Sequence, residues 1–370
     1  MGWWASMKKA LSGDGGGGGY LRLSDNDPPA SASPTQPAGG GGTTEAGVAG
    51  IDAPELPLRE VKEATRSFSG ARLVGVGQHA TVYRASLRGG RAAAAKRLER
   101  KLSPGDAAVL RRQLAAASRL RHDNVARLLG YTIAGDLGVL LYEFADLGTL
   151  HDVLHGPREG IDPAPERRKK PASSRSAAPT RLSWEQRARI ALDAARGLEY
   201  LHEGAAPPVT HRDVRSTNVL LFEGSRAKIG DHDLFKQAPE CELNAHVVVH
   251  PGAAVYWPPE CLTTGHTTPK FDVYSFGVVL VELLTGRKPE TLWQLRGLLD
   301  WVTAMVTEDR IEEFMDPKLG GQYPRDEALK LGRIAVQCLQ EGPKSRPSMD
   351  AVARAIRDDI VRETNTATAG

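Results

Sequence analysis

The spacing of hydrophobic residues changes along the chain. From residue 71 to residue 87 ("ARLVGVGQHATVYRASL"), apolar residues alternate around a pair of glycines, which predicts a β-hairpin. Residues 58–68 and 183–203 instead have the spacing of amphipathic helices. Ser183 and Gln186 have the spacing of a capping box at the start of the second helix. Strand patterns come first and helix patterns follow, so the sequence predicts an α+β protein with two lobes.

Two segments interrupt this order. Residues 1–50 are rich in Gly, Pro and Ser and hold few bulky apolar residues, which predicts a disordered tail. Residues 156–181 form a Pro-, Ser- and charge-rich stretch that is typical of a loop insertion. The run "RRKK" at 167–170 offers an acidic partner a docking point, but a solvated loop is the preferred interpretation.

A transmembrane helix is not expected. No apolar run approaches the roughly 18–20 residues that span a bilayer, and "VYSFGVVLVELL" (273–284) is predicted to be a buried helix. The start, "MGWWAS", matches the Met-Gly-x-x-x-Ser pattern for myristoylation, although the bulky Trp3 disfavours it. Weak membrane contact through Trp3, Trp4 and the nearby lysines is one alternative, and a free tail is the other.

Composition and charge narrow the class of protein. The chain has 370 residues, of which 41% are hydrophobic and 25% charged, as in a globular protein with a core. A formal net charge of +3 argues against a dedicated nucleic-acid binder. Cys241, Cys261 and Cys338 are few and far apart, so we expect free thiols rather than disulfides or a zinc site.

Several short motifs carry chemistry, and they appear in a fixed order. "GVGQHATV" (75–82) is a glycine-rich loop of the kind that approaches phosphates, and Lys96 follows in "AAAAKR". In "THRDVRSTNVLL" (210–221), an Asp and an Asn five residues later match the catalytic-loop pattern H-R-D-L-x-x-x-N of protein kinases. "KIGDHDL" (228–234) stands where D-F-G is expected, and "YWPPE" (256–260) where A-P-E is expected.

These motifs resemble those of eukaryotic protein kinases, and most closely the plant receptor-like cytoplasmic kinases of the Pto-interacting group. The resemblance runs from about Leu56 to Ile360 and includes "YEFADLGTLHDVLHG" and "DVYSFGVVLVELLTGRKP". It implies a kinase fold with a small antiparallel-sheet lobe bearing one helix, and a larger helical lobe. The implied division is a tail (1–50), a preceding helix (51–70), the two lobes (71–145 and 146–360) and a second tail (361–370).

The resemblance also implies roles for individual residues. Asp213 would orient the substrate hydroxyl, with Lys96 and Arg215 as the other catalytic residues, and Asn218 and Asp231 would hold Mg²⁺. Tyr142 would be the gatekeeper of the adenine site, Asp272 would anchor the catalytic loop, and Glu260 would pair with Arg346. Val82, Ala94 and Leu220 would sandwich adenine, and backbone groups of Glu143 and Ala145 would bond its edge. The implied ATP-binding residues are Val74, Gly75, Gly77, Val82, Ala94, Lys96, Glu143, Ala145 and Leu220.

Four positions near the chemistry depart from the kinase pattern. Ala80 stands at the third glycine of the loop, and Gln113 stands where a glutamate should pair with Lys96. Gln113 retains a carbonyl that is able to accept a weaker hydrogen bond from the lysine, and the resembled group also carries Gln there. His232 and Asp233 replace the Phe and Gly of D-F-G.

The activation segment departs further. Residues 231–255 contain no Ser, Thr or Tyr, so phosphorylation of this segment cannot supply the usual partner of Arg212. Our hypothesis is that Glu240 or Glu242 acts as a permanent negative charge; reversing both to Lys should lower activity or stability, and no effect on either would refute it. Ala253 replaces a threonine whose hydroxyl normally bridges toward the catalytic aspartate.

The sequence therefore predicts a protein serine/threonine kinase that uses ATP and Mg²⁺ in signal transduction. The alternative is a pseudokinase, a scaffold that acts through protein contacts. The implied partners are a protein substrate and an upstream receptor or kinase, without nucleic acid. The implied location is the cytoplasm, with peripheral plasma-membrane contact as a further option.

Overall fold

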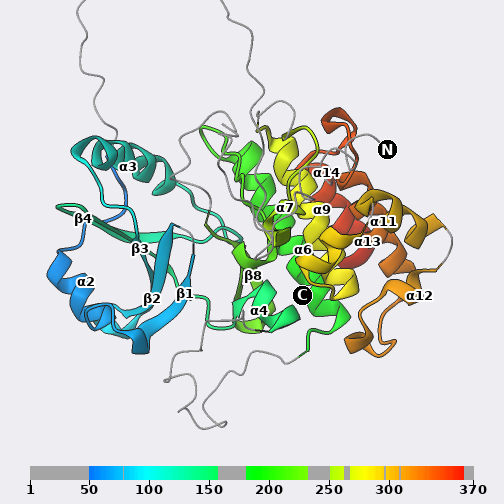
Figure 1. Cartoon of the computed structure of the whole chain (residues 1–370), viewed down its shortest axis with the longest axis horizontal. Coiled ribbons are helices and arrows are strands. Elements are labelled where there is room, and N and C mark those ends of the chain that lie inside the picture. Colours follow the sequence, from blue (N-terminus) through cyan, green and yellow to red (C-terminus); the bar gives the residue numbers. More distant parts are fainter. Residues whose placement is uncertain are drawn as a thin grey trace, which may run out of the picture.

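The protein has two lobes that lie side by side, one rich in strands and one helical (Figure 1). The computed structural model describes residues 50–77, 79–156, 181–231, 251–261, 267–295, 297–307 and 310–361. The expectations for the two tails, for the basic insertion and for His232, Asp233, Glu240 and Glu242 lie outside these residues, as does the side chain of Ala253. The two-lobed α+β prediction is confirmed for the described chain.

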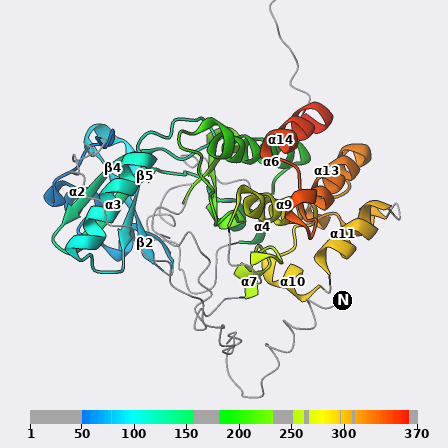
Figure 2. The same cartoon turned by 90° about the horizontal axis from the view of Figure 1, so that it is seen from above.

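The small lobe is built on an antiparallel sheet with the strand order β1-β2-β3-β5-β4. The predicted hairpin is its β1–β2 pair. Two helices, α2 (Leu58–Thr65) and α3 (Pro104–Ala117), pack on this sheet (Figure 2). The strands are β1 (Leu73–Val76), β2 (Ala80–Ser86), β3 (Ala92–Leu98), β4 (Leu128–Ala134) and β5 (Leu137–Glu143).

The two helices cover opposite faces of the sheet because side chains alternate along each strand. Leu110 and Leu114 of α3 share a core cluster with Leu140 of β5. Val61 of α2 lies in a different cluster, with the neighbouring strand residue Leu141. Each face of the sheet therefore has its own apolar layer, and α3 lies on the face that carries the even-numbered residues of β2 and β3.

Helix α2 ends three residues before the sequence predicted. It ends at Thr65, and the next three residues, Arg66, Ser67 and Phe68, all have positive φ angles between 53° and 56°. Left-handed backbone cannot continue a right-handed helix, so the chain turns away here. The turn is stabilised by the Ser67 N–H, which donates to the Lys62 carbonyl at 2.6 Å.

The chain before α2 lies along strand β4. The Leu56 N–H donates to the Tyr131 carbonyl at 2.8 Å, and the Tyr131 N–H donates to the Pro54 carbonyl at 3.0 Å. Ala53 is buried in the same core cluster as Leu110 of α3. The segment 51–56 is therefore part of the small lobe, although it precedes the first strand of the sheet.

The helical lobe is organised around α9, which runs from Pro269 to Thr285. All residues from Phe271 to Thr285 are buried, which confirms the predicted buried helix. Among the described residues, no helix is both long and apolar enough to cross a bilayer. The other helices are α4 (Leu150–His155), α6 (Trp184–Glu199), α7 (Pro251–Ala254), α10 (Pro289–Gln294), α11 (Leu298–Thr307), α12 (Ile311–Phe314), α13 (Arg325–Cys338) and α14 (Met349–Ile356).

Helix α6 begins as the sequence predicted, and its start is close to a buried ion pair. The Ser183 side chain accepts from the Gln186 N–H, and the Gln186 side chain accepts from the Ser183 N–H, which completes the capping box. One turn into the helix, Arg187 donates to Asp316 at 2.5 Å and to the Leu283 carbonyl at 2.7 Å. Both charged side chains are at least 96% buried, so this pair joins α6 to the chain after α12 inside the lobe, and the Leu283 bond joins α6 to the end of α9.

A small second sheet lies next to the predicted site residues of the large lobe. Its strands are β6 (Gly148–Thr149), β7 (Val219–Phe222) and β8 (Arg226–Ile229), in the order β6-β7-β8. Strand β8 lies against the small lobe, since the Ala126 N–H donates to the Ile229 carbonyl at 2.8 Å. The residues that follow β8 are therefore held at the boundary between the lobes.

Candidate functional site

The predicted adenine-binding side chains come from both sheets. On the small lobe, Val82 lies opposite Lys96 and Arg84 lies opposite Ala94 in the β2–β3 register. Directly opposed side chains of an antiparallel pair share one face, so all four lie on the face that α3 partly covers. Val82 and Ala94 are half-buried there, unlike the buried residues on the other face. Leu220, the third expected contact, is half-buried on β7 of the large lobe.

Gly230 allows Leu220 to approach strand β8 closely. A Cβ atom at position 230 would lie 2.6 Å from Leu220 Cδ1. Carbon atoms do not approach so closely, so any side chain at position 230 would push the leucine away. The Gly230 N–H also donates to the Asn218 carbonyl at 2.9 Å, which ties the residue before Asp231 to the catalytic loop.

The segment that joins the lobes begins at the end of β5. Tyr142, the expected gatekeeper, lies opposite Ala94 in the β3–β5 register, and burial raises the pKa of its hydroxyl well above the usual value. Glu143 ends β5, and the Ala145 carbonyl accepts from the Gly148 N–H at 3.1 Å. We call residues 142–147 the hinge, because they connect the two sheets.

The glycine-rich loop is exposed along strand β1 and anchored at the start of β2. Val74 is 37% exposed, and Val76, which lies between Gly75 and Gly77, is 52% exposed. Gly75 has open space around it. The Gly77 N–H donates to the Ala80 carbonyl at 2.8 Å, and Ala80 is buried at the start of β2. Ala80 therefore takes a core position, and its methyl group is part of the cluster beneath α3.

Lys96 binds the predicted metal ligand across the lobes. Its ammonium group donates to Asp231 Oδ1. Gln113 lies on α3, at the position where the resemblance leads one to expect a glutamate, but no hydrogen bond joins it to Lys96 among the described residues. Asp231 has a φ of 59°, a left-handed conformation that Asp and Asn tolerate better than most residues. The lysine–aspartate contact brings together two of the predicted site residues.

The catalytic loop forms a compact polar unit around Asp213. Arg215 donates to Asp213 Oδ2 at 2.6 Å. The Asn218 side-chain amide donates to the same oxygen at 3.0 Å and to the Asp213 carbonyl at 2.7 Å. With its NH₂ group engaged, Asn218 has its amide oxygen to offer a metal ion, and the Gly230 bond places Asp231 close by. Oxygen ligands suit Mg²⁺, so these residues fit the expected ion.

Asp272 holds the catalytic loop from below, as expected. This fully buried carboxylate on α9 accepts from the backbone N–H groups of His211 at 2.6 Å and Arg212 at 2.7 Å. The His202 ring also contacts it at 2.7 Å. Arg212 has a φ of 66°, and the two backbone bonds fix that strained turn immediately before Asp213.

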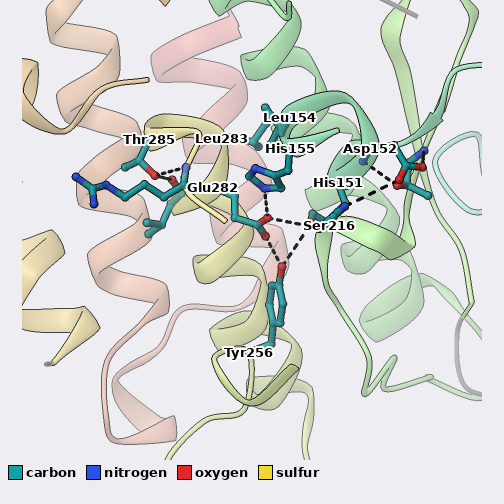
Figure 3. A network of polar contacts seen from close by, with 12 residues as sticks. His151, Asp152, Leu154, His155, Ser216, Tyr256, Glu282, Leu283 and Thr285 are labelled. Carbon is teal, nitrogen blue, oxygen red and sulfur yellow. Dashed lines mark hydrogen bonds and ion pairs between the residues drawn. The ribbon is translucent and has the colours of Figure 1, made fainter. Parts of the chain in front are cut away.

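A second buried carboxylate on α9 was not predicted to have a role. Glu282 is 0% exposed and contacts His155 Nε2 at 2.8 Å, Ser216 Oγ at 2.8 Å and the Tyr256 hydroxyl (Figure 3). Ser216 is in the catalytic loop, two residues before Asn218. We call these four residues the Glu282 cluster; it connects α4, the catalytic loop and the chain before α9. Burial raises the pKa of the Tyr256 hydroxyl, and the adjacent Glu282 raises it further, so this group stays a neutral donor.

The other expected ion pair of the large lobe is present. Arg346 donates to both carboxylate oxygens of Glu260, at 2.6 and 2.8 Å. Cys261, next to Glu260, and Cys338 on α13 are buried and form no disulfide, as expected, and burial raises the pKa of Cys338 to about 12. Among the described residues, no group of three or more His, Cys, Asp or Glu side chains forms a separate metal site.

Comparisons with known proteins agree with the two-lobed kinase fold. A family model described as protein tyrosine and serine/threonine kinase matches residues 69–356. The PTI1-like tyrosine-protein kinases 3 and 1 of Arabidopsis thaliana are each 44% identical over 312 residues, which is 83% of this chain and 73% and 82% of theirs. The solved pseudokinase domain of BIR2, an immune regulator of the RLK/Pelle family, matches with a TM-score of 0.60 and 30% identity over 82% of this chain and 87% of that one. This chain belongs to the protein tyrosine and serine/threonine kinase family.

Proposed function

We propose that this kinase transfers the γ-phosphoryl group of ATP to a serine or threonine hydroxyl of a protein, with Mg²⁺ as the ion. One observation carries the proposal: Lys96, Asp213, Asn218 and Asp231 are all retained and are linked by a continuous set of contacts. Lys96 binds Asp231, the residue before Asp231 bonds to Asn218, and Asn218 bonds to Asp213. A chain that had abandoned catalysis would have no need to keep these four groups in register.

Asp213 is oriented for a substrate hydroxyl. Its Oδ2 accepts from both Arg215 and Asn218, and among the described residues Oδ1 receives no hydrogen bond. Oδ1 is therefore the oxygen that would accept the hydroxyl proton. Two donors on Oδ2 keep the carboxylate from rotating, and orientation of this kind lowers the barrier by avoiding reorganisation.

Lys96, Asn218 and Asp231 would bind the triphosphate end of ATP. Mg²⁺ neutralises charge that develops on the phosphoryl oxygens, and the two oxygen-bearing side chains would hold it. Lys96 would place its charge against the phosphates from the side of the small lobe. In that state its ammonium group would divide its contacts between phosphate and Asp231.

A pseudokinase function is the second candidate. The observation that favours it is the missing contact between Gln113 and Lys96 in the described chain, which leaves α3 without its usual tie to the lysine. The solved pseudokinase of BIR2 shows that the fold supports signalling without catalysis. We infer a cytoplasmic location for this chain, a protein substrate and an upstream receptor or kinase as partners, and peripheral contact with the plasma membrane as a further option.

Phosphoryl transfer can be tested directly. The purified protein is incubated with labelled ATP, Mg²⁺ and peptides that carry only Ser, only Thr or only Tyr. We expect label on the Ser and Thr peptides, and background with Asp213→Asn and Lys96→Met. Equal background labelling in the wild type, Asp213→Asn and Lys96→Met would exclude kinase activity. Thermal shifts with ATP, with and without Mg²⁺, would then separate a nucleotide-binding pseudokinase from an inert scaffold.

A further inference from the structure

Two positive side chains, one from each lobe, contact adjacent residues of the hinge. Lys228 on β8 of the large lobe lies 2.7 Å from Glu143 Oε2. Arg84 on β2 of the small lobe lies with its guanidinium carbon 4.7 Å from the centre of the Phe144 ring. Glu143 and Phe144 are consecutive, so the hinge is contacted from both lobes at one point.

The strand registers explain how these side chains reach the hinge. Lys228 lies directly opposite Leu220 in the β7–β8 pair, so both side chains share one face of the small sheet. Arg84 follows Val82 by two residues on β2, so it also lies on the face of Val82. The two sheet faces predicted to enclose adenine, that of Val82 and that of Leu220, therefore each contribute one cation to the hinge.

The Lys228–Glu143 contact is better supported than a surface ion pair usually is. The side chains of Lys228 and Glu143 are only 22% and 28% exposed. The Lys228 ammonium also lies 5.2 Å from the Phe222 ring centre, and Glu143 Oε2 also accepts from the Arg127 N–H at 3.3 Å. Partial burial reduces screening by salt, and a cation above an aromatic ring adds attraction.

The position of Lys228 connects the hinge to the metal-binding residue. Lys228 precedes Asp231 by three residues on the same strand and the turn that follows it. Movement of the hinge would therefore displace β8, and movement of β8 would displace the hinge. Glu143 and Ala145 are the residues whose backbone groups are expected to bond the adenine edge, so their position decides whether those bonds form.

We propose that Lys228 and Arg84 are positioning residues that brace the hinge from the two lobes and thereby set the affinity for the nucleotide. The inference rests on the proposed function, since it takes ATP as the ligand. Neither residue is assigned a role in the chemical step. Their effect is on the backbone of Glu143 to Ala145, through Glu143 and Phe144.

The test measures the affinity of a fluorescent ATP analogue, together with KM for ATP and kcat. Lys228→Met and Glu143→Gln should each weaken binding about fivefold, a coupling of ordinary size, and Lys228→Met should leave kcat within about twofold. The reversed pair, Glu143→Lys with Lys228→Glu, should recover a large part of the loss. The matched control is Arg226→Met. Arg226 is a cation on the same strand, but it pairs with Asp193 at 3.1 Å and not with the hinge.

The sign of the Glu143→Gln effect separates a brace from simple electrostatics. ATP is an anion, so long-range attraction alone predicts that losing Lys228 weakens binding and losing the charge of Glu143 strengthens it. A brace predicts that both changes weaken it. Arg84→Met should weaken binding too, because it removes the contact with Phe144.

Hydrogen exchange at the hinge keeps the inference separate from the proposed function. In the absence of nucleotide, Lys228→Met should speed amide exchange of Phe144 and Ala145, whereas Arg226→Met should not. If the wild-type protein binds no nucleotide, the proposed function fails, and the exchange rates still decide whether the brace exists. Affinity or exchange in Lys228→Met equal to that in Arg226→Met would overturn the inference.

Discussion

Removing the His155 ring should cost the large lobe a substantial part of its stability. The ring is 1% exposed at its side chain, and its Nε2 contacts the fully buried carboxylate of Glu282 at 2.8 Å. The substitution His155→Leu keeps an apolar group of similar size and removes this polar contact. Glu282 would keep only its contacts with Ser216 and Tyr256.

The size of the effect follows from the burial of the charge. Removing one partner of a buried ion pair typically costs about 3–5 kcal/mol, because the remaining charge is left without compensation. Two hydroxyl donors remain on Glu282, so we expect a smaller loss, about 2–3 kcal/mol. At about 2–4 °C per kcal/mol for a unit of this size, the melting temperature should fall by ~4–12 °C.

The assay is thermal and urea unfolding of matched variants. His155→Gln places an amide donor near Glu282 and should lose less than half as much stability as His155→Leu. In a Glu282→Gln background the buried charge is gone, so adding His155→Leu should cost about 1 kcal/mol or less. If His155→Leu melts within about 1 °C of the wild type, or costs as much in the Glu282→Gln background as in the wild-type background, the reasoning about a stranded charge is wrong.

Three further predictions concern the fold. Gly197→Ala should lower the free energy of unfolding in urea by about 1–3 kcal/mol or more, since the added Cβ would overlap the Asn124 carbonyl oxygen. An alanine substituted on the exposed face of α6 would meet no such overlap and serves as the control. Arg187→Met should lower the free energy of unfolding by about 3–5 kcal/mol, because it leaves Asp316 buried without its ion-pair partner. The double variant with Asp316→Leu should recover much of this loss. A double variant no more stable than Arg187→Met would contradict the prediction. Burial lowers the pKa of His122 in the folded protein below 6.5. The stability that the neutral ring contributes is therefore present above pH 6.5 and is lost as the pH falls through the lower folded pKa. Between about pH 7.5 and 5.0, the free energy of unfolding should fall less in His122→Phe than in the wild type.

The sequence predicted the fold and the contacts that belong to linear motifs. Asp272 and the Glu260–Arg346 pair were expected because their residues stand in recognisable motifs, and the structure places their side chains in contact. The start of α6 was predicted from its capping box, a pattern of adjacent residues. Features of this kind are encoded locally, so their spacing along the chain is enough to find them.

Contacts between distant residues could not be predicted in the same way. Glu143 and Lys228 are 85 residues apart, and His155 and Glu282 are 127 apart. The first pair depends on how the two lobes pack together, and the second on packing within the helical lobe. A signal for the second pair was present: Glu282 is a charged residue in a helix predicted to be buried. A buried carboxylate needs donors, but the sequence alone does not say which side chains supply them.

The segment 51–56 has a consequence for where this protein can be shortened. The family model begins at residue 69, yet β4 is an edge strand, and its outer side is covered by the residues before α2. A chain trimmed to the matched region would lose the partner of Tyr131 and expose an unpaired sheet edge. Exposed edges recruit strands from other molecules, so such a chain should aggregate even if its catalytic residues are intact. We therefore expect the unit that resists aggregation to be longer than the region matched by the family model.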